Sequence, residues 1–246
     1  MKFNIITIFP KFFDGFKKEA LIARAQVKKI ISIKAHDLRK WTTDNHQTAD
    51  GRPYGGGAGM VIMVEPIMKA VKKIKTEKEA HTIVFSAAGK KFNQATARRW
   101  AKLDQLILIC GRYEGVDERV AQYIADEEIS IGDYVLFGGE VPAMVVMEAV
   151  TRLLPGAVGK EESVANESFT NPESIEHPHY TRPEAIKINN KMRRVPKVLL
   201  SGNHASIKKW RAEQSMTKTK KNRKDLLTQT SLPRRGEGLR EKSVHD

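Results

Sequence analysis

Cysteine is almost absent from this sequence: Cys110 is the one thiol among 246 residues. A disulfide within one chain and a zinc site built on several cysteines are therefore excluded. Cys110 ends the apolar run 106–109, which predicts a buried position in a core. The shortage of cysteine also fits a reducing compartment, so we expect a cytoplasmic protein.

Long hydrophobic runs are missing as well. The apolar start, Met1–Pro10, is too short to cross a bilayer, and it lacks the basic n-region and cleavage site of a signal peptide. We therefore expect a soluble protein that is not exported and has no membrane partner.

Acidic residues are scarce at the C-terminal end. The whole chain has 43 Lys and Arg against 29 Asp and Glu, a net charge of +14. From Asn189 onward there are 16 basic residues against 5 acidic ones, whereas residues 1–188 are nearly balanced, with 27 against 24. This asymmetry favours a polyanionic partner for the C-terminal quarter. The alternative is a solvated charge run without a partner.

The order of apolar segments predicts the fold class. Segments of strand length alternate with segments of helical character, which indicates an α/β fold with a mostly parallel sheet. A later apolar segment, Val141–Leu154, predicts a buried helix that stops before Pro155 and Gly156. The predicted strands are Phe3–Phe9, Thr82–Phe85 and Leu106–Cys110, and the predicted helices between them are Phe12–Ala25, Glu65–Lys75 and Gln94–Lys102.

The chain changes character after this sheet region. Residues 159–178 are polar and without periodicity, which is typical of a linker. Residues 183–227 alternate basic and apolar side chains and predict a small helical domain, clearest over Ala205–Ser215. We expect a sheet domain over 1–159, a flexible linker over 160–176, and a basic helical domain over 177–246 with a frayed end.

Three glycine-rich loops are the strongest candidates for a site. Pro53–Met60 has four glycines in five positions but lacks the Lys-Ser/Thr of a P-loop, and alone it reads as a turn. Cys110–Arg119 follows a strand directly, and Ser130–Ala143 leads into a helix. Ligands of open α/β sheets bind where strands end, so we expect the loops to share one pocket. Its backbone groups would suit a flat heteroaromatic ring such as adenine.

Two further motifs complete a resemblance. Together with His179–Pro183 and Leu200–His204, the loops resemble the bacterial tRNA (guanine-N1)-methyltransferases, from Met1 to about Leu227. The resemblance implies a SPOUT-class sheet domain with a deep trefoil knot, an exception to the rule against threaded chains. It also implies a homodimer whose active site uses both chains, and methyl transfer from S-adenosylmethionine to N1 of guanine 37, 3′ of the tRNA anticodon.

The resemblance further implies which residues bind the methyl donor. Most contacts would come from the main chain, so side-chain variation is tolerable there. Phe137 departs from the small serine that is usual in the family. The implied donor-binding residues are Phe85, Ser86, Ala87, Ala88, Gly111, Tyr113, Glu114, Ser130, Ile131, Gly132, Tyr134, Leu136, Gly138, Gly139 and Pro142.

The reaction requires a base and a cation. Guanine N1 carries a proton at neutral pH, and charge develops on O6 as the proton leaves. The resemblance implies that Arg152 is the catalytic arginine, although it could also be a helix-surface arginine. Glu167 stands where the family has its basic aspartate, and we interpret it as the catalytic base. The alternatives are an attenuated enzyme or a base supplied by Asp50 or Glu114. We expect Glu167 to become ordered when tRNA binds.

Metal binding is weakly indicated. The family needs magnesium, and Glu114, Glu167 and the carboxylate of the donor could offer oxygen ligands. No dedicated metal motif is visible. His177 and His179 come without a cysteine or a third spaced ligand and make a poor site.

Basic residues of the second half are expected to hold tRNA phosphates. After Gln214 and Ser215 the family has an apolar anchor, whereas this chain has a lysine-rich run, which predicts a stronger salt dependence. Alternatives are a knotted methyltransferase for another RNA and a catalytically silent RNA-binding protein. The expected tRNA-binding residues are Asp50, Tyr54, Gly55, Gly57, His179, Tyr180, Arg182, Ser201, Asn203, Lys208 and Arg211, and phosphate contacts are also expected from Lys191, Arg193, Arg194 and Lys209.

Overall fold

A computed structural model describes residues 1–159 and 167–228 of the chain. The chain divides into two compact units, Met1–Val164 and Ala165–Asp246. Among the described residues, no helix is both long enough and apolar enough to cross a membrane.

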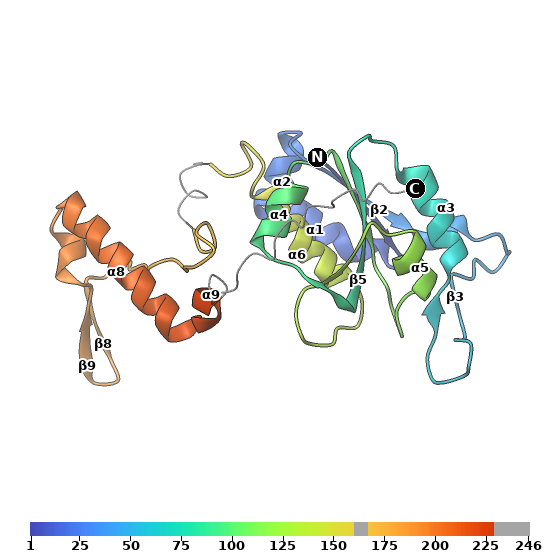
Figure 1. The fold of residues 1–246 in the computed structure, drawn as a ribbon. Helices are drawn as coiled ribbons and strands as arrows, with labels where there is room; N and C mark the ends of the chain where they lie inside the picture. Colours follow the sequence, from blue (N-terminus) through green and yellow to red (C-terminus); the bar gives the residue numbers. More distant parts are fainter. Residues whose placement is uncertain (160–166, 229–246) are drawn as a thin grey trace, which may run out of the picture. The chain divides into compact units, whose positions relative to one another are not determined.

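The first unit is built on a five-stranded parallel sheet with the order β2-β1-β6-β5-β7 (Figure 1). The α/β class with a parallel central sheet is thus confirmed. Every residue of β6 is buried, as expected of a central strand that is covered on both faces. The strands are β1 (Lys2–Thr7), β2 (Ser32–Asp37), β5 (Ala80–Lys91), β6 (Gln105–Ile109) and β7 (Glu127–Ser130).

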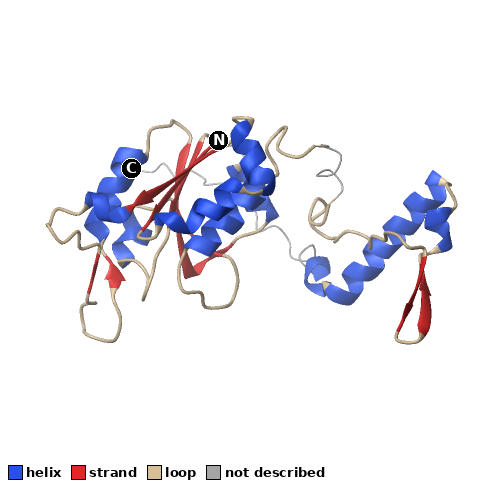
Figure 2. Cartoon of the chain, turned by 180° about the vertical axis from the view of Figure 1, so that it is seen from behind, coloured by secondary structure: helices blue, strands red, loops and turns tan. Residues whose placement is uncertain are grey.

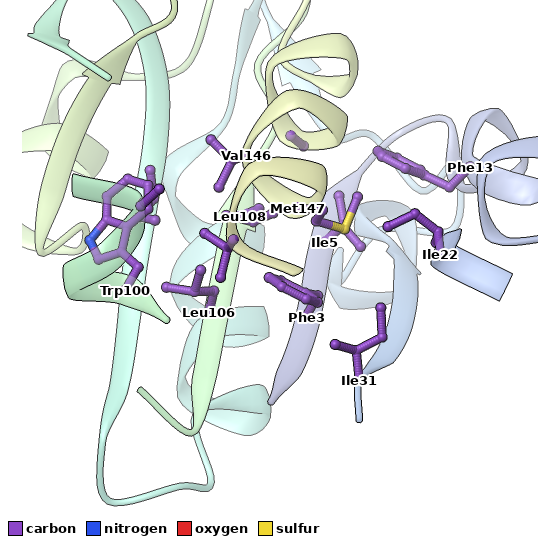
Figure 3. Close-up of a cluster of buried hydrophobic side chains, with 14 of the residues drawn as sticks. Phe3, Ile5, Phe13, Ile22, Ile31, Trp100, Leu106, Leu108, Val146 and Met147 are labelled. Atoms are coloured by element: carbon purple, nitrogen blue, oxygen red, sulfur yellow. The ribbon is translucent and has the colours of Figure 1, made fainter. Parts of the chain in front are cut away.

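Alternate residues of the strands feed two separate cores. Phe3, Ile5, Leu106 and Leu108 point to one face, where they meet Val146 and Met147 of α6 (Glu140–Thr151) (Figure 3). Residues such as Ile107 and Ile109 point to the other face. Full burial of a side chain of this size contributes roughly 1.5–3 kcal/mol, so the two cores fix the sheet between its helices.

Helices cover both faces of the sheet (Figure 2). One core includes residues of α2 (Ala20–Val27), α4 (Gln94–Trp100) and α6. The opposite core includes residues of α3 (Val64–Ile74), α5 (Glu118–Tyr123) and the 3₁₀ helix η2 (Leu38–Trp41). A short antiparallel pair, β3 (Asp50–Gly51) with β4 (Val61–Ile62), carries the first glycine loop at its tip.

The segment Phe12–Ala25, predicted to be helical, is helical in separate pieces. The chain forms a 3₁₀ helix η1 (Pro10–Phe13), α1 (Asp14–Lys18) and α2, and Glu19 is extended between the helices. Phe13 and Ile22 are both buried in the same core. Nine residues correspond to 900° on a straight helix, which would put these two side chains on opposite faces. The break lets both of them reach the core.

The second unit contains a β-hairpin that the sequence analysis assigned to helix. β8 (Ala185–Ile188) and β9 (Lys191–Arg194) pair antiparallel. Asn189 and Asn190 form the turn with φ values of 50° and 60°. Two consecutive positive φ angles are the mark of a type I′ hairpin turn, which asparagine tolerates well. The helical prediction for 185–194 is therefore wrong, and the Asn-Asn pair was the signal that could have corrected it.

Three helical elements follow the hairpin in the second unit. The 3₁₀ helix η3 (Lys197–Leu200) precedes α8 (His204–Asn222), and α9 (Lys224–Thr228) follows it. The side chain of Asn203 caps α8 by accepting a hydrogen bond from the backbone N–H of Ser206, at 3.0 Å. α8 extends well beyond the predicted segment Ala205–Ser215.

Part of the predicted linker is attached to α8. The backbone N–H of Ile175 donates to Thr219 Oγ1 at 3.0 Å, and Ser215 Oγ donates to the carbonyl of Ile175 at 2.6 Å. Thr219 is fully buried. The C-terminal end of the predicted linker thus contacts α8, and its flexibility stays a prediction. The rest of the predicted linker, 160–166, and the predicted frayed end, in 229–246, lie outside the described residues.

Candidate functional site

A cavity of about 360 Å³ lies at the C-terminal ends of β6 and β7 and at an irregularity of β5. It is lined by parts of the second and third glycine loops and by residues just after Val84. Of the fifteen expected donor-binding residues, only Ala88 is not part of the lining. Ala88 is exposed, and its backbone N–H donates to Ser86 Oγ at 3.0 Å. The predicted residues that line the cavity are Phe85, Ser86, Ala87, Gly111, Tyr113, Glu114, Ser130, Ile131, Gly132, Tyr134, Leu136, Gly138, Gly139 and Pro142.

The first glycine loop does not line this cavity, so the expectation of one pocket shared by three loops is wrong for it. The loop packs against the second loop instead: the backbone N–H of Glu114 donates to the carbonyl of Met60 at 3.0 Å. A Cβ atom at Gly59 would lie 2.4 Å from Glu114 Oε1. The loop therefore supports one wall from outside.

The second and third loops approach each other by their backbones. The N–H of Gly139 donates to the carbonyl of Gly111 at 2.9 Å, and Arg112 forms an isolated antiparallel bridge with Gly138. A Cβ atom at Gly139 would lie 2.7 Å from Cys110 Cα, closer than side chains are found to come. Glycine is thus required at 139 by space.

Two hydroxyl groups of the cavity lining bond to backbone carbonyls of the third loop, and the rim offers apolar side chains. Ser130 is buried, and its hydroxyl donates to the carbonyl of Gly132 at 3.1 Å. Tyr134 OH donates to the carbonyl of Ile131 at 3.1 Å. By contrast, Val135 and Phe137 are 95% and 92% exposed, so this part of the third loop is a rim rather than a core element.

A buried ion pair adjoins the cavity. Glu140 is fully buried at the start of α6 and accepts hydrogen bonds from Arg112 Nε at 2.9 Å and from Thr7 Oγ1 at 2.7 Å. Burial raises the pKa of the nearby Cys110 thiol well above its usual value, which keeps that thiol protonated. Sequence reasoning missed Arg112, Glu140 and Thr7, because only the fold brings them together.

Arg152 lies away from this cavity within one chain. It is the C-cap residue of α6 and lines a second cavity of about 310 Å³, together with Glu19, Glu148 and residues of α1 and α2. Glu114 lines the first cavity, and Glu167 belongs to the second unit. The backbone N–H of Thr170 donates to the carbonyl of Glu167 at 3.1 Å, within a turn that precedes the β8–β9 hairpin in the chain.

Comparison with known proteins identifies the family of the chain. The sequence profile described as tRNA (Guanine-1)-methyltransferase TrmD matches residues 1–229. A protein of Carboxydothermus hydrogenoformans named tRNA (guanine-N(1)-)-methyltransferase is 51% identical over 227 residues, which cover 92% of this chain and 87% of the relative. Proteins of the same name from Dictyoglomus turgidum and Geotalea uraniireducens are 48% and 47% identical, each match covering 94% of this chain and 92% of the relative.

The chain belongs to the tRNA (Guanine-1)-methyltransferase TrmD family. This membership supports the resemblance drawn from the glycine loops.

The family resemblance also named residues for tRNA, and in the first unit these are exposed or half-buried. Asp50 is in β3 opposite Ile62, while Tyr54, Gly55 and Gly57 are in the exposed first glycine loop. Tyr54 is completely exposed.

In the second unit, some of the predicted tRNA residues make local hydrogen bonds and others are exposed on the surface. Ser201 accepts a hydrogen bond from the backbone N–H of Asn203 at 3.2 Å, and Asn203 caps α8. Tyr180 lies 6.3 Å from Trp210 between ring centroids. Arg182, Lys208 and Arg211 are exposed. Ser201 and Asn203 therefore have structural roles that alone explain their presence.

The second unit also holds a cluster of possible metal ligands, of which the sequence analysis considered only the two histidines. Among the described residues, Glu176, His177 and His179 have potential ligand atoms within 4.8 Å of one another. His179 Nε2 lies 2.9 Å from Glu176 Oε1, and this ion pair explains the proximity. In the first cavity, Glu114 is the one predicted magnesium ligand present, so the described residues of the lining do not fit a dedicated magnesium site.

Proposed function

We propose that this chain binds S-adenosylmethionine in the 360 Å³ cavity and transfers its methyl group to N1 of guanine 37 in tRNA. One observation carries the proposal. In a chain of this family, two glycine loops close a cavity at the carboxyl end of a parallel sheet, where open α/β sheets bind their ligands.

The residues of the cavity fit the donor. The volume is within the range of small-molecule sites. Backbone N–H and C=O groups of the two loops would recognise the adenine edge, and Leu136 and Pro142 would flank the ring. When bound, S-adenosylmethionine supplies an electrophilic methyl group on a sulfonium.

A deep trefoil knot is part of the proposal. The support comes from the loop contacts, since Gly139 bonds to Gly111 and Gly138 bridges to Arg112. The third loop thus passes against the second before it enters α6. Such a crossing would hold the donor in a bent shape.

The acceptor chemistry is assigned to Arg152 and Glu167. The Glu167 carboxylate accepts the proton of guanine N1, and the Arg152 guanidinium donates a hydrogen bond to O6, where negative charge develops. N1 then takes the methyl group as its bond to sulfur breaks. The products are 1-methylguanine in tRNA and S-adenosylhomocysteine.

A homodimer would complete the site. Arg152 and the donor cavity lie at opposite ends of α6 in one chain. A second copy could bring its own Arg152 to the cavity. The exposed basic residues of the second unit, including Lys208 and Arg211, would bind tRNA phosphates.

The test is a methylation assay with a tRNA that carries guanine 3′ of its anticodon. We expect 1-methylguanine from the wild type and from Glu167→Asp, and a loss of about 10²-fold or more in kcat for Glu167→Ala and Arg152→Ala. Glu173→Ala removes a second carboxylate near Glu167 in the chain, one that is exposed, and should leave the rate unchanged.

The products distinguish the alternatives. Ribose 2′-O-methylation or methylation only of another RNA would replace the proposed reaction, and tRNA binding without turnover would indicate a silent RNA-binding protein. Full activity of Glu167→Ala would show that Glu167 is not the catalytic base, and Asp50 or Glu114 would then be the candidates.

A further inference from the structure

The buried pair Arg112–Glu140 is held from several sides. The side chain of Glu140 is 1% exposed and that of Arg112 is 17% exposed. One carboxylate oxygen of Glu140 accepts from Arg112 Nε and the other from Thr7 Oγ1. Thr7 Oγ1 in turn accepts from the backbone N–H of Phe9 at 2.9 Å. The carboxylate thus has charged and neutral partners and faces no solvent.

The pair joins three segments that are distant in sequence. Thr7 ends β1, Arg112 belongs to the second loop, and Glu140 is the first residue of α6. The neighbouring backbone carries the contacts between the two loops, from Gly111 to Gly139 and from Arg112 to Gly138. Arg112 lines the cavity together with these glycines, whereas Glu140 does not, so the ion pair joins the wall formed by the two loops to the buried start of α6.

The side chain of Arg112 is held by several contacts, although the residue also lines the cavity. A Cβ atom at Gly138 would lie 2.5 Å from Arg112 Cδ and 2.6 Å from Nε, so the side chain runs closely over that glycine. Its guanidinium carbon lies 4.9 Å from the ring centre of Phe9 and 5.6 Å from that of Phe12. The ion pair with Glu140 and the two aromatic rings hold the group in place, which is what a positioning role requires.

Removal of one partner would disturb the loops. A buried carboxylate without its cation is strongly unfavourable, and the chain relieves the imbalance by moving. Glu140 is fixed by α6, whose N-terminus favours a negative charge. The second loop is the part that can shift, and its shift opens the contact between Gly111 and Gly139.

We propose that Arg112 and Glu140 are positioning residues that set the spacing of the two glycine loops and thereby the affinity for the methyl donor. This inference rests on the proposed function, because it concerns the same cavity. It predicts that the ion pair affects the affinity for the methyl donor and leaves the affinity for tRNA unchanged.

The experiment measures binding of S-adenosylhomocysteine by calorimetry, well below the melting temperature of each variant. Arg112→Met and Glu140→Gln should raise its Kd by about tenfold or more, and Arg112→Lys should restore part of the affinity. KM for S-adenosylmethionine should rise more than kcat falls, while Kd for tRNA stays at the wild-type value. The double variant Arg112→Met/Glu140→Gln should bind no worse than the single variants, because no unpaired charge is left.

The matched control is Glu77→Gln, which breaks the ion pair with Lys2, located at the start of β1. It should leave the Kd for S-adenosylhomocysteine unchanged. If Arg112→Met and Glu140→Gln lower the melting temperature but bind with wild-type Kd, the pair is only structural and the proposal is overturned. If a variant does not fold, Thr7→Val removes one hydrogen bond of the network and should weaken binding in the same direction, and an unchanged Kd would again overturn it. Failure of the wild type to bind would instead overturn the proposed function itself.

Discussion

Arg152 and Pro142 lie at opposite ends of helix α6. Pro142 lines the cavity proposed for the donor, whereas Arg152 lines the second cavity. Ten residues of helix correspond to about 15 Å along its axis. One chain therefore does not bring its own Arg152 to its own donor cavity without moving the whole helix.

Mixed dimers should reveal this division. Arg152→Ala and Gly139→Val are each expected to be inactive, the first for lack of the arginine and the second for lack of a donor pocket. When the two are unfolded and refolded together, mixed dimers contain one intact composite site, and about a quarter of wild-type activity should return. Activity of Arg152→Ala alone, or no recovery on mixing while each variant still dimerises, would contradict the shared site.

The close approach at Gly139 gives a second prediction. Gly139→Ala places a methyl group 2.7 Å from Cys110 Cα, and backbone atoms on both sides resist the shift. We expect a loss of about 1–3 kcal/mol in the free energy of unfolding and weaker binding of S-adenosylhomocysteine. Gly159→Ala, where nothing lies within 4 Å, is the control and should change neither quantity. Equal behaviour of the two variants would show that the loops are not tightly packed.

Low pH should lower the stability of the first unit because it protonates Glu127. Its carboxylate accepts hydrogen bonds from Arg99 at 2.6 and 2.8 Å, and Trp100 and His81 also contact it. Arg99 above all lowers the pKa of Glu127 from 4.5 to about 2. Because the folded pKa is depressed, this stabilisation is complete above pH 4.5 and is lost as the pH falls towards 2.

Glu127→Gln should therefore lower the free energy of unfolding by roughly 2 kcal/mol at pH 7, and the difference from wild type should shrink between pH 4.5 and 2. Urea unfolding followed by circular dichroism at several pH values measures both effects. Glu65→Gln, which removes an exposed i,i+4 pair with Lys69, is the control and should cost at most about 0.5 kcal/mol. A difference that does not depend on pH would refute the assignment.

The basic second unit should make tRNA binding sensitive to salt. With six or more phosphate contacts, the affinity should fall by about 10³-fold or more between 50 and 200 mM salt. Arg211→Ala should reduce the slope of log K against log salt by about one. Lys73→Ala, which removes an exposed lysine of α3 in the first unit, should not change the slope. Filter binding over a salt series gives the slopes, and a nearly flat wild-type series would exclude this mode of binding.

The sequence was sufficient for features that depend on local pattern. Mostly apolar runs predicted β1 and β6, and the positions of the second and third glycine loops beside regular elements marked them as site candidates. The family resemblance then named most of the residues that line the cavity. β2 and β7 were missed because polar residues interrupt them: Ser32–Asp37 has only two apolar side chains, and Glu127–Ser130 has one. Edge strands bury less surface, so their pattern is weaker.

Features that depend on distant contacts could not be predicted. Thr7 and Glu140 are 133 residues apart, and nothing in either local sequence announces their hydrogen bond. The separation of Arg152 from the cavity likewise depends on the direction in which α6 runs. By contrast, the Asn189-Asn190 turn could have been predicted from the sequence, because its residue types fit the positive φ angles that it adopts.

The pairing of β5 with β7 has a consequence for the rate of ligand capture. β5 pairs with β7 up to Phe85 and again from Lys90, so strand pairing fixes both ends of the four-residue segment 86–89. This wall of the cavity is preorganised, and a ligand would lose little conformational entropy of the protein on entry. Association should then be governed by diffusion and by passage over the exposed rim at Val135 and Phe137, with no slow ordering step.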